Sequence, residues 1–424
     1  MNCKICKSKK IIKITNLESQ PISSVFLSKK NFNLKKYNIN LYQCYKCKLI
    51  QFKSLPPLGE MYGKTYGYRT SLSKLMINHM KEKFIKFSKL GIIKKNSNIL
   101  DIGSNDGTFL NFFANKEKKL NLYGIDPSSE KFKKFYNKKI NLITDYFTYE
   151  NFFKNINNQG QKFKLITSFA MFYDIDNPNK FCKDIYKLLD KDGLWALEIS
   201  YFPALLKNLT YDQICHEHVT YYTLTTFNNL VKKQGFKILD FRFNEINGGS
   251  IEIICAKKSN NIKSNDSKIK KHLMDEKNIT LDSYKKFNER VENTKKNILE
   301  ILKLVGSKNI IGYGASTKGN IVLNHCNITS KNISYICDEN SYKFNKFTPG
   351  SNIKIISKEK MRKLQPKYLL ILIWSFRKEV IKQEINYINK GGKLIFHLPQ
   401  LHIIDKSNYK AYLKKDFKPL SFDY

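Results

Sequence analysis

The stretch Ile99-Leu-Asp-Ile-Gly-Ser-Asn-Asp-Gly-Thr-Phe-Leu110 decides the fold of this 424-residue chain. Its first residues are apolar enough for a buried strand, its glycines permit a tight turn, and the residues after the turn begin a helix. A strand, a glycine-bearing turn and a helix in this order open a doubly wound α/β sheet. We therefore predict a Rossmann-like nucleotide-binding unit around this stretch.

The composition of the turn favours a cationic ligand over a dinucleotide. A dinucleotide-binding turn needs a middle glycine for close approach to a pyrophosphate, whereas this turn has Asn105 there and Asp106 beside it. Asp101 and Asp106 could receive the amino and sulfonium groups of S-adenosylmethionine (SAM). Asp126, at the end of the strand expected at 122–125, is placed for hydrogen bonds to ribose hydroxyls. The predicted SAM-binding residues are Asp101, Gly103, Ser104, Asn105, Asp106, Gly107, Asp126, Asp145 and Ala170.

The rest of this unit continues the α/β pattern. Strand-like runs at 165–169 and 194–199 alternate with helical stretches, and a late pair at 236–243 and 250–256 resembles a hairpin. This order fits the sheet of a class I SAM methyltransferase. We assign residues 61–257 to that central domain.

A second α/β unit follows a charged segment, 258–300, which we expect to be a helical linker. The run Asn309-Ile-Ile-Gly-Tyr-Gly-Ala-Ser-Thr-Lys-Gly319 again gives a strand, a glycine turn and a helix. Further strands are expected at 333–337, 368–373 and 393–396. We therefore predict a Rossmann-like C-terminal domain over 301–424.

The N-terminal 60 residues carry the pattern of a small zinc-binding module. Two Cys-x-x-Cys pairs, Cys3 with Cys6 and Cys44 with Cys47, can supply four thiolates to one tetrahedral ion. Four protein ligands leave no open coordination position, so we predict a structural Zn²⁺ site rather than a catalytic one.

The segment Cys215-His-Glu-His218 carries the clearest catalytic signal. Two of only seven histidines flank a carboxylate within a polar stretch, and a histidine beside a carboxylate is suited to removing a proton near pH 7. Metal binding is an alternative, but on a strand His216 and His218 would share a face while Glu217 points away, and the HExxH spacing is absent. A purely structural role also stays open; we favour acid–base chemistry.

The charge and hydropathy of the chain limit its partners. Lys and Arg outnumber Asp and Glu by 75 to 36, which gives a formal net charge of +39 and suggests a polyanionic partner. However, Lys accompanies abundant Asn and Ile along the whole chain, as an AT-rich genome would produce, and no basic arm concentrates the charge. No apolar run approaches the 18 residues that span a bilayer, and no signal peptide is evident. We expect a cytoplasmic protein without a membrane or nucleic-acid partner.

Taken in order, these motifs resemble the three-domain sugar C-methyltransferases of deoxysugar biosynthesis. The resemblance covers essentially the whole chain and rests on the two Cys pairs, 99–110, the His-Glu-His triplet, Asn247-Gly-Gly-Ser250 and Gly312-Tyr-Gly-Ala315. It implies a zinc-binding domain, a central SAM domain and a C-terminal domain that helps to hold a nucleotide-sugar. The implied substrate is a ketosugar attached to a nucleoside diphosphate.

The resemblance also implies a mechanism in which a base removes the proton beside the sugar ketone and the resulting enolate takes the methyl group. His218 is then the first choice of base, Glu217 orients or relays, and His216 is a donor or second base. Tyr66 or Tyr68 would lie near the sugar. The implied substrate-binding residues are Asn247, Gly312, Gly314 and Lys318, although the two glycines are equally explained by packing.

Two residues depart from the family pattern. Cys215 stands where many members have Tyr, and Asp174 stands where many have His, so Asp174 joins the candidate catalytic residues. A methyltransferase acting on oxygen or nitrogen of a sugar or other small molecule is an alternative function. A zinc-dependent nucleic-acid-binding or RNA-modifying protein is a more remote one, and the oligomeric state stays open.

Overall fold

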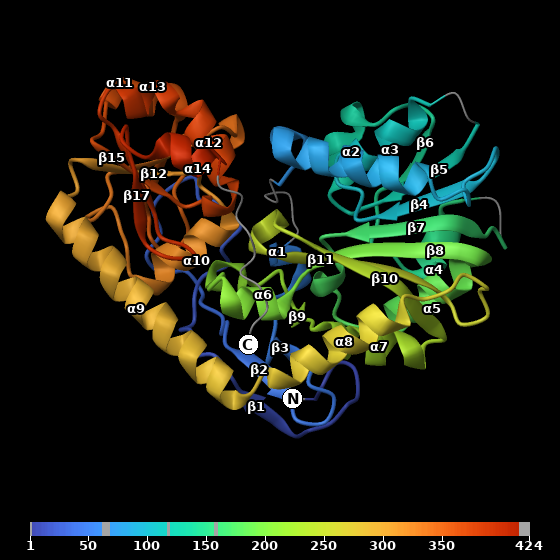
Figure 1. The fold of residues 1–424 in the computed structure, drawn as a ribbon. Helices are drawn as coiled ribbons and strands as arrows, with labels where there is room; N and C mark the ends of the chain where they lie inside the picture. The colour runs from blue at the N-terminus through green and yellow to red at the C-terminus, as the bar shows by residue number, and fades with distance from the viewer. Residues whose placement is uncertain (1, 62–67, 117–118, 157–159, 415–424) are drawn as a thin grey trace.

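Three β-sheets organise the chain in the computed structural model, which describes residues 2–61, 68–116, 119–156 and 160–414. Figure 1 shows two α/β units side by side, with a small N-terminal sheet below them. The predicted α/β class, with a cysteine-bearing N-terminal module and two Rossmann-like units, is confirmed. In the described part of the chain, no helix is both long enough and apolar enough to cross a membrane.

The N-terminal sheet is antiparallel, and its last strand comes from the central part of the chain, far from the other three in sequence. Its order is β1 (Ile11–Lys13), β2 (Leu41–Cys44), β3 (Ile50–Phe52) and β9 (Thr220–Tyr221). The short helix α1 (Leu58–Met61) follows β3. Because β9 comes directly after the Cys-His-Glu-His segment, this pairing fixes that segment against the zinc module.

The central sheet has the order β10-β11-β8-β7-β4-β5-β6. Six strands run in one direction and β11 runs antiparallel to both of its neighbours, which places a reversed strand inside an otherwise doubly wound sheet. The strands are β4 (Asn98–Ile102), β5 (Asn121–Ile125), β6 (Ile140–Ile143), β7 (Phe163–Phe169), β8 (Leu189–Ser200), β10 (Phe236–Asn244) and β11 (Ser250–Lys257). β6 was not predicted from the sequence.

Helices cover both faces of the central sheet. One face packs against α2 (Lys74–Ser88) and α3 (Thr108–Ala114), whose buried Met and Phe side chains form one core. The other face packs against α4 (Tyr149–Lys154), α5 (Pro178–Leu188) and α7 (Leu224–Lys233). The near-continuous apolar sequence of the parallel strands follows from burial on both faces.

The C-terminal sheet has the order β14-β13-β12-β15-β16-β17, and all its pairs are parallel except the last. Its strands are β12 (Ile310–Tyr313), β13 (Tyr335–Asp338), β14 (Lys354–Ser357), β15 (Tyr368–Ile371), β16 (Lys393–Phe396) and β17 (His402–Ile404). Its helices are α10 (Thr317–His325), α11 (Lys358–Leu364), α12 (Arg377–Gln383), α13 (Ile385–Asn389) and α14 (Tyr409–Lys414). The sequence analysis missed β14 and β17.

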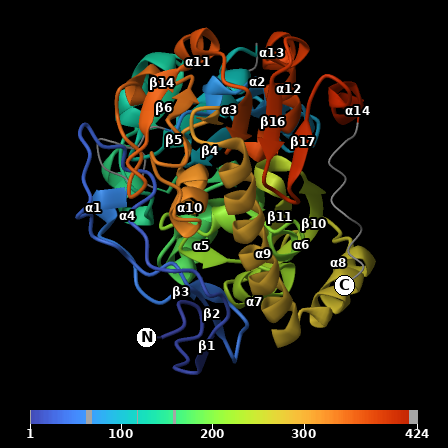
Figure 2. The ribbon, with the colours of Figure 1, turned by 90° about the vertical axis from the view of Figure 1, so that its left-hand side faces the viewer.

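Three helices connect the units. α6 (Phe202–Lys207) follows β8, and α8 (Asp266–Asp275) leads into the 25-residue α9 (Leu281–Val305), which runs from the C-terminal unit down past the small sheet (Figure 2). Asn288 of α9 donates to the carbonyl of Ile14 at 3.0 Å, so the helix also braces the N-terminal module.

Candidate active site

A cavity of about 340 Å³ lies where the three sheets meet. The N-terminal module contributes Ser24 and Phe26, the loop after β7 contributes Ala170 and Asp174, and the C-terminal unit contributes the loops after β12 and β15. In the central sheet, the strand order reverses at β4 and β7, and of these two strands only β7 is followed by a loop whose described residues line the cavity. In the C-terminal sheet, the loops leave the carboxyl ends of β12 and β15, the two strands at which the strand order reverses. That position is the usual ligand crevice of an open α/β sheet.

The Cys-His-Glu-His segment is a turn rather than the strand assumed from its sequence. The amide of His218 donates to the carbonyl of Cys215 at 3.0 Å, which closes the turn. Cys215, Glu217 and His218 line the cavity, whereas His216 is absent from its lining and packs edge-on against the ring of Tyr37. The assumption that the two histidines share a face is therefore wrong, because a turn does not alternate its side chains as a strand does.

The electrostatics of the turn reflect its burial. Burial lowers the pKa of His218 to about 3, and the positive charge of Lys318 acts in the same direction. Burial also lowers the pKa of His216 to about 4 and raises the pKa of Glu217, although Ser24 opposes the latter shift. The imidazole of His218 is consequently neutral near pH 7 and can accept a proton.

Neighbouring side chains hold His218 in the cavity wall. Its ring lies 4.3 Å, centroid to centroid, from that of Tyr173, which follows β7. Asp174, the next residue, lines the same cavity and raises the pKa of Cys215, as burial and Glu217 also do. The structure thus brings three of the predicted catalytic residues together: His218, Glu217 and Asp174.

Of the two tyrosines predicted to lie near the sugar, the structure describes only Tyr68. Tyr68 lines the cavity with its side chain partly exposed, whereas Tyr66 lies outside the described residues. The residues after Tyr68 cover the glycine turn of the central sheet: the amide of Thr70 donates to Asn105 Oδ1 at 3.0 Å, and that of Ser71 donates to Asp106 Oδ2 at 2.9 Å. This covering segment leads directly into α2.

The glycine turn has the backbone that the sequence predicts. Gly103 and Gly107 adopt φ of +75° and +74°, and a Cβ on Gly107 would lie 2.7 Å from the ring of Tyr136. The hydroxyl of Tyr136 bonds Ser104 Oγ at 2.8 Å and the carbonyl of Asn105 at 2.9 Å. No local sequence pattern indicates Tyr136, which supports the turn from a segment about 30 residues further along the chain.

The acidic residues of the predicted SAM site also hold the loop together. Asp126, just after β5, accepts from the amide of Asn105 at 2.9 Å through Oδ2 and from Ser128 through Oδ1. Burial and the charge of Asp126 raise the pKa of Asp101 to about 7, although a hydrogen bond from Thr167 opposes this shift. An acidic, glycine-bearing turn of this kind fits a cationic ligand with ribose hydroxyls, although none of these residues of the described chain lines the cavity. Asp145 lies two residues beyond β6 and is partly buried.

In the C-terminal unit, packing explains both predicted glycines. A Cβ on Gly312 would lie 2.8 Å from Ile336, and one on Gly314, where φ is +90°, would lie 2.5 Å from Ile373. Neither glycine lines the cavity, but the next residues, Ser316 to Lys318, do. The Nζ of Lys318 donates to Asn247 Oδ1 at 2.9 Å, so the two predicted substrate-binding side chains are direct partners.

Two cavity residues were not predicted. The indole of Trp374, just after β15, donates to Asp212 Oδ2 at 2.8 Å. Asp212 lies in the polar segment that leads to the Cys-His-Glu-His turn, and burial raises its pKa against the opposing effects of Lys318 and Trp374. Trp374 could have been found from the sequence, because it directly follows the strand predicted at 368–373 of a doubly wound sheet.

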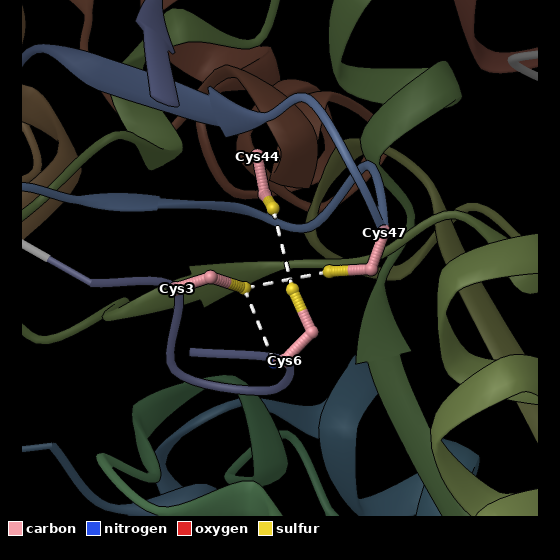
Figure 3. Close-up of side chains that lie close together, drawn as sticks. All are labelled: Cys3, Cys6, Cys44 and Cys47. Carbon is pink, nitrogen blue, oxygen red and sulfur yellow. Dashed lines mark hydrogen bonds between the residues drawn. The ribbon is translucent and has the colours of Figure 1, made fainter. Parts of the chain in front are cut away.

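The four cysteines converge at the other end of the N-terminal module (Figure 3). Their sulfur atoms all lie within 4.8 Å of one another, and the pairs Cys3–Cys47 and Cys6–Cys44 are 3.4 and 3.5 Å apart. A tetrahedral Zn²⁺ with bonds of about 2.3 Å requires sulfurs about 3.8 Å apart, so the cluster fits the ion. It is the one group of potential metal ligands found among the described residues.

Comparisons with known proteins agree with this architecture. Residues 3–62 match a zinc-binding domain family, residues 74–240 a methyltransferase domain family, and residues 245–399 the C-methyltransferase C-terminal domain family. The C-methyltransferase NovU of Streptomyces niveus is 25% identical over 410 residues, which cover 95% of this chain and 96% of that protein. The chain is a methyltransferase. It is a SAM-dependent enzyme with a structural zinc module.

Two solved structures align with part of this chain. A methyltransferase complexed with the Trm112 activator of Haloferax volcanii is 10% identical, covering 43% of this chain and 94% of that one with a TM-score of 0.34. The plantazolicin methyltransferase BpumL, bound to S-adenosylhomocysteine, is 14% identical, covering 44% of this chain and 88% of that one with a TM-score of 0.35.

Proposed function

We propose that this C-methyltransferase transfers the SAM methyl group to the carbon beside the ketone of a nucleoside-diphosphate ketosugar, in deoxysugar or surface-glycan biosynthesis. The observation that carries the proposal is the cavity at which all three units meet. The His-Glu-His turn lies on one wall and a Rossmann-like switch point on another. A base and a nucleotide crevice in one cavity suit an acceptor that is both acidic at carbon and attached to a nucleotide.

His218 is the proposed base. Its neutral imidazole can take the proton beside the ketone, and the negative charge that develops on the substrate raises the low pKa of His218 as the proton arrives. The C–H electron pair becomes the enolate, whose carbon forms the new bond to the methyl group that SAM supplies. Glu217, whose pKa is raised by burial, and Asp174 are proposed to orient or relay protons in the same wall.

The other predicted residues take supporting places in this proposal. Tyr68 lies on the cavity and is proposed to contact the sugar. His216 is 1% exposed and faces Tyr37, so we propose that it supports the turn and is not a second base. The glycine turn with Asp101 and Asp126 is proposed to hold SAM, and the segments after β13 and β14 are proposed to hold the nucleotide.

Deuterium exchange tests the proposal. The purified protein, labelled SAM and a panel of nucleoside-diphosphate ketosugars are incubated in deuterated water, and methyl transfer and exchange beside the ketone are followed together. We expect both with at least one sugar, and we expect His218→Asn to abolish both while retaining SAM binding. Methylation of a ketone-free acceptor without any exchange would instead support oxygen or nitrogen methylation.

A further inference from the structure

Three polar residues from distant segments meet on the cavity wall near the His-Glu-His turn. Asp212 precedes the turn, Asn247 follows β10, and Lys318 lies in the first turn of α10. Lys318 Nζ donates to Asn247 Oδ1 at 2.9 Å, and the carbonyl of Asn247 accepts from Gln213, the neighbour of Asp212, at 2.5 Å. The three residues thus form one connected group.

This group has hydrogen-bonding capacity that the described protein does not use. Asp212 is 1% exposed, and its Oδ1 has no hydrogen-bond partner among the described residues, while its Oδ2 accepts from Trp374. The ammonium of Lys318 has three donors, and the hydrogen bonds found in the described chain use one of them. A buried carboxylate oxygen without a partner is costly, which points to a ligand that supplies the missing hydrogen bond.

Asp212 and Lys318 both line the cavity, yet they are absent from the ion pairs within 4.0 Å in the described chain. Burial raises the pKa of Asp212 and lowers that of Lys318, and the charge of each group opposes the shift of the other. The same ammonium lowers the pKa of His218, so it lies within electrostatic reach of the proposed base. A substrate oxygen between Lys318 and Asp212 would therefore lie beside the group that removes the proton.

We propose that Lys318 is the catalytic donor to the ketone oxygen and that Asp212 accepts a hydrogen bond from an adjacent sugar hydroxyl. This inference rests on the proposed function. As His218 removes the proton, the C–H pair forms the carbon–carbon double bond of the enolate and the carbonyl π pair moves to oxygen, where Lys318 stabilises the negative charge. When the carbon takes the methyl group, the electrons return from oxygen and the carbon–sulfur pair stays on sulfur.

The position of Lys318 supports this role over diphosphate binding. Its nearest partner, Asn247, belongs to the central unit, and the N-terminus of α10 adds a further positive field to its surroundings. Two other lysines on the cavity, Lys343 and Lys358, belong to the C-terminal unit beyond β13 and β14. They are the groups that we assign to the diphosphate.

The test compares Lys318→Met with Lys360→Met, which removes an exposed lysine of α11. Exchange beside the ketone, methyl transfer, SAM binding, and binding of dTDP or UDP alone are measured for each. Loss of one oxyanion donor lowers kcat by about 10²–10³-fold. We expect a loss of this size in both exchange and methyl transfer for Lys318→Met, with unchanged SAM and dTDP or UDP affinity, and no effect of Lys360→Met.

Other outcomes separate the two proposals. Normal exchange by Lys318→Met, or a loss of dTDP or UDP affinity as large as the loss of kcat, overturns the role of Lys318 alone. Absence of exchange by the wild type with every ketosugar overturns the proposed function, and this inference with it. If Lys318→Met does not fold, Lys318→Ala with added propylammonium replaces it, because restored exchange would require a cation at the ketone and not merely a filled space.

Discussion

The indole Nε1 of Trp374 donates a hydrogen bond to Asp212 Oδ2 at 2.8 Å across 162 residues of sequence. Trp374 belongs to the C-terminal unit and Asp212 to the segment that leads into the His-Glu-His turn. The bond therefore ties the proposed nucleotide-binding unit to the wall that carries the proposed base.

Trp374→Phe keeps most of the ring and removes this hydrogen bond. Because Asp212 is buried, we expect a loss of about 1–3 kcal/mol in the free energy of unfolding and a fall of about tenfold or more in kcat/KM. The matched control is Trp195→Phe, which removes a hydrogen bond of 2.9 Å to Ser168 inside the central sheet. That control should lose stability and keep its KM; equal kinetic effects in both variants would contradict a specific role for Trp374.

Gly248 lies in the turn that presents Asn247 to Lys318. Its φ is +84°, and an added Cβ would lie 2.6 Å from Trp374. Gly248→Ala should therefore displace Asn247 or Trp374 and reduce activity at least tenfold.

Gly91→Ala is the control for Gly248→Ala, since Gly91 also has positive φ, +70°, but no atom within 4 Å of an added Cβ. Gly91→Ala should lower the free energy of unfolding only by the backbone strain, about 1–2 kcal/mol, and should keep full activity. Steady-state kinetics and thermal unfolding distinguish the two effects. Full activity of Gly248→Ala would show that the close approach to Trp374 is not needed.

A buried charge network anchors α2 to the central sheet. Glu198 and Glu252 are directly opposite each other on β8 and β11, and Lys83 Nζ lies 2.7 and 2.5 Å from their carboxylates. Lys83→Met leaves the two carboxylates facing each other in the core, so we expect a loss of about 3–5 kcal/mol in the free energy of unfolding. Lys86 contacts Glu252 from a more exposed position, so Lys86→Met should cost about 0–1 kcal/mol. Similar losses in chemical denaturation would contradict this account.

Asp101 links stability to pH. Its folded pKa of about 7 exceeds the unfolded value of about 3.9, so the folded chain binds more protons between these values and its stability falls as pH rises through them. Asn cannot ionise, so Asp101→Asn does not show this fall in stability with rising pH.

Relative to wild type, Asp101→Asn should gain up to about 4 kcal/mol at pH 8 and little at pH 4, while its SAM affinity falls about tenfold or more. Thermal unfolding at the two pH values and SAM titration check both effects. A stability difference that does not change with pH would rule out the raised pKa.

The zinc module should hold one ion per chain. Cys47→Ser removes a ligand and should abolish zinc binding and lower the unfolding temperature, because metal binding contributes directly to the folding of such modules. Cys182→Ala, in the core of the central unit, is the control and should retain the metal. Elemental analysis gives the zinc content, and retention of zinc by Cys47→Ser would contradict the four-cysteine site.

Local patterns in the sequence determined the fold class, both glycine turns and the four zinc ligands. Each depends on residues close together in the chain: a strand followed by a glycine turn and a helix, or two thiolates three residues apart. Short strands at sheet edges, such as β6 and β17, were missed because three or four residues with mixed polarity have no clear period.

The tertiary structure alone decided which residues share the cavity. The sequence left both His216 and His218 as candidates, with His218 preferred as base, but pairing of β9 with β3 and the turn at Cys215 leave His218 on the cavity and direct His216 toward Tyr37. Likewise, nothing local connects Asp212 to Trp374 or Lys318 to Asn247. These pairs form because the segments that follow β8 and β10 in the central unit meet the segments that follow β12 and β15 in the C-terminal unit at one cavity. A contact of this kind depends on packing between units and not on any repeat within the sequence.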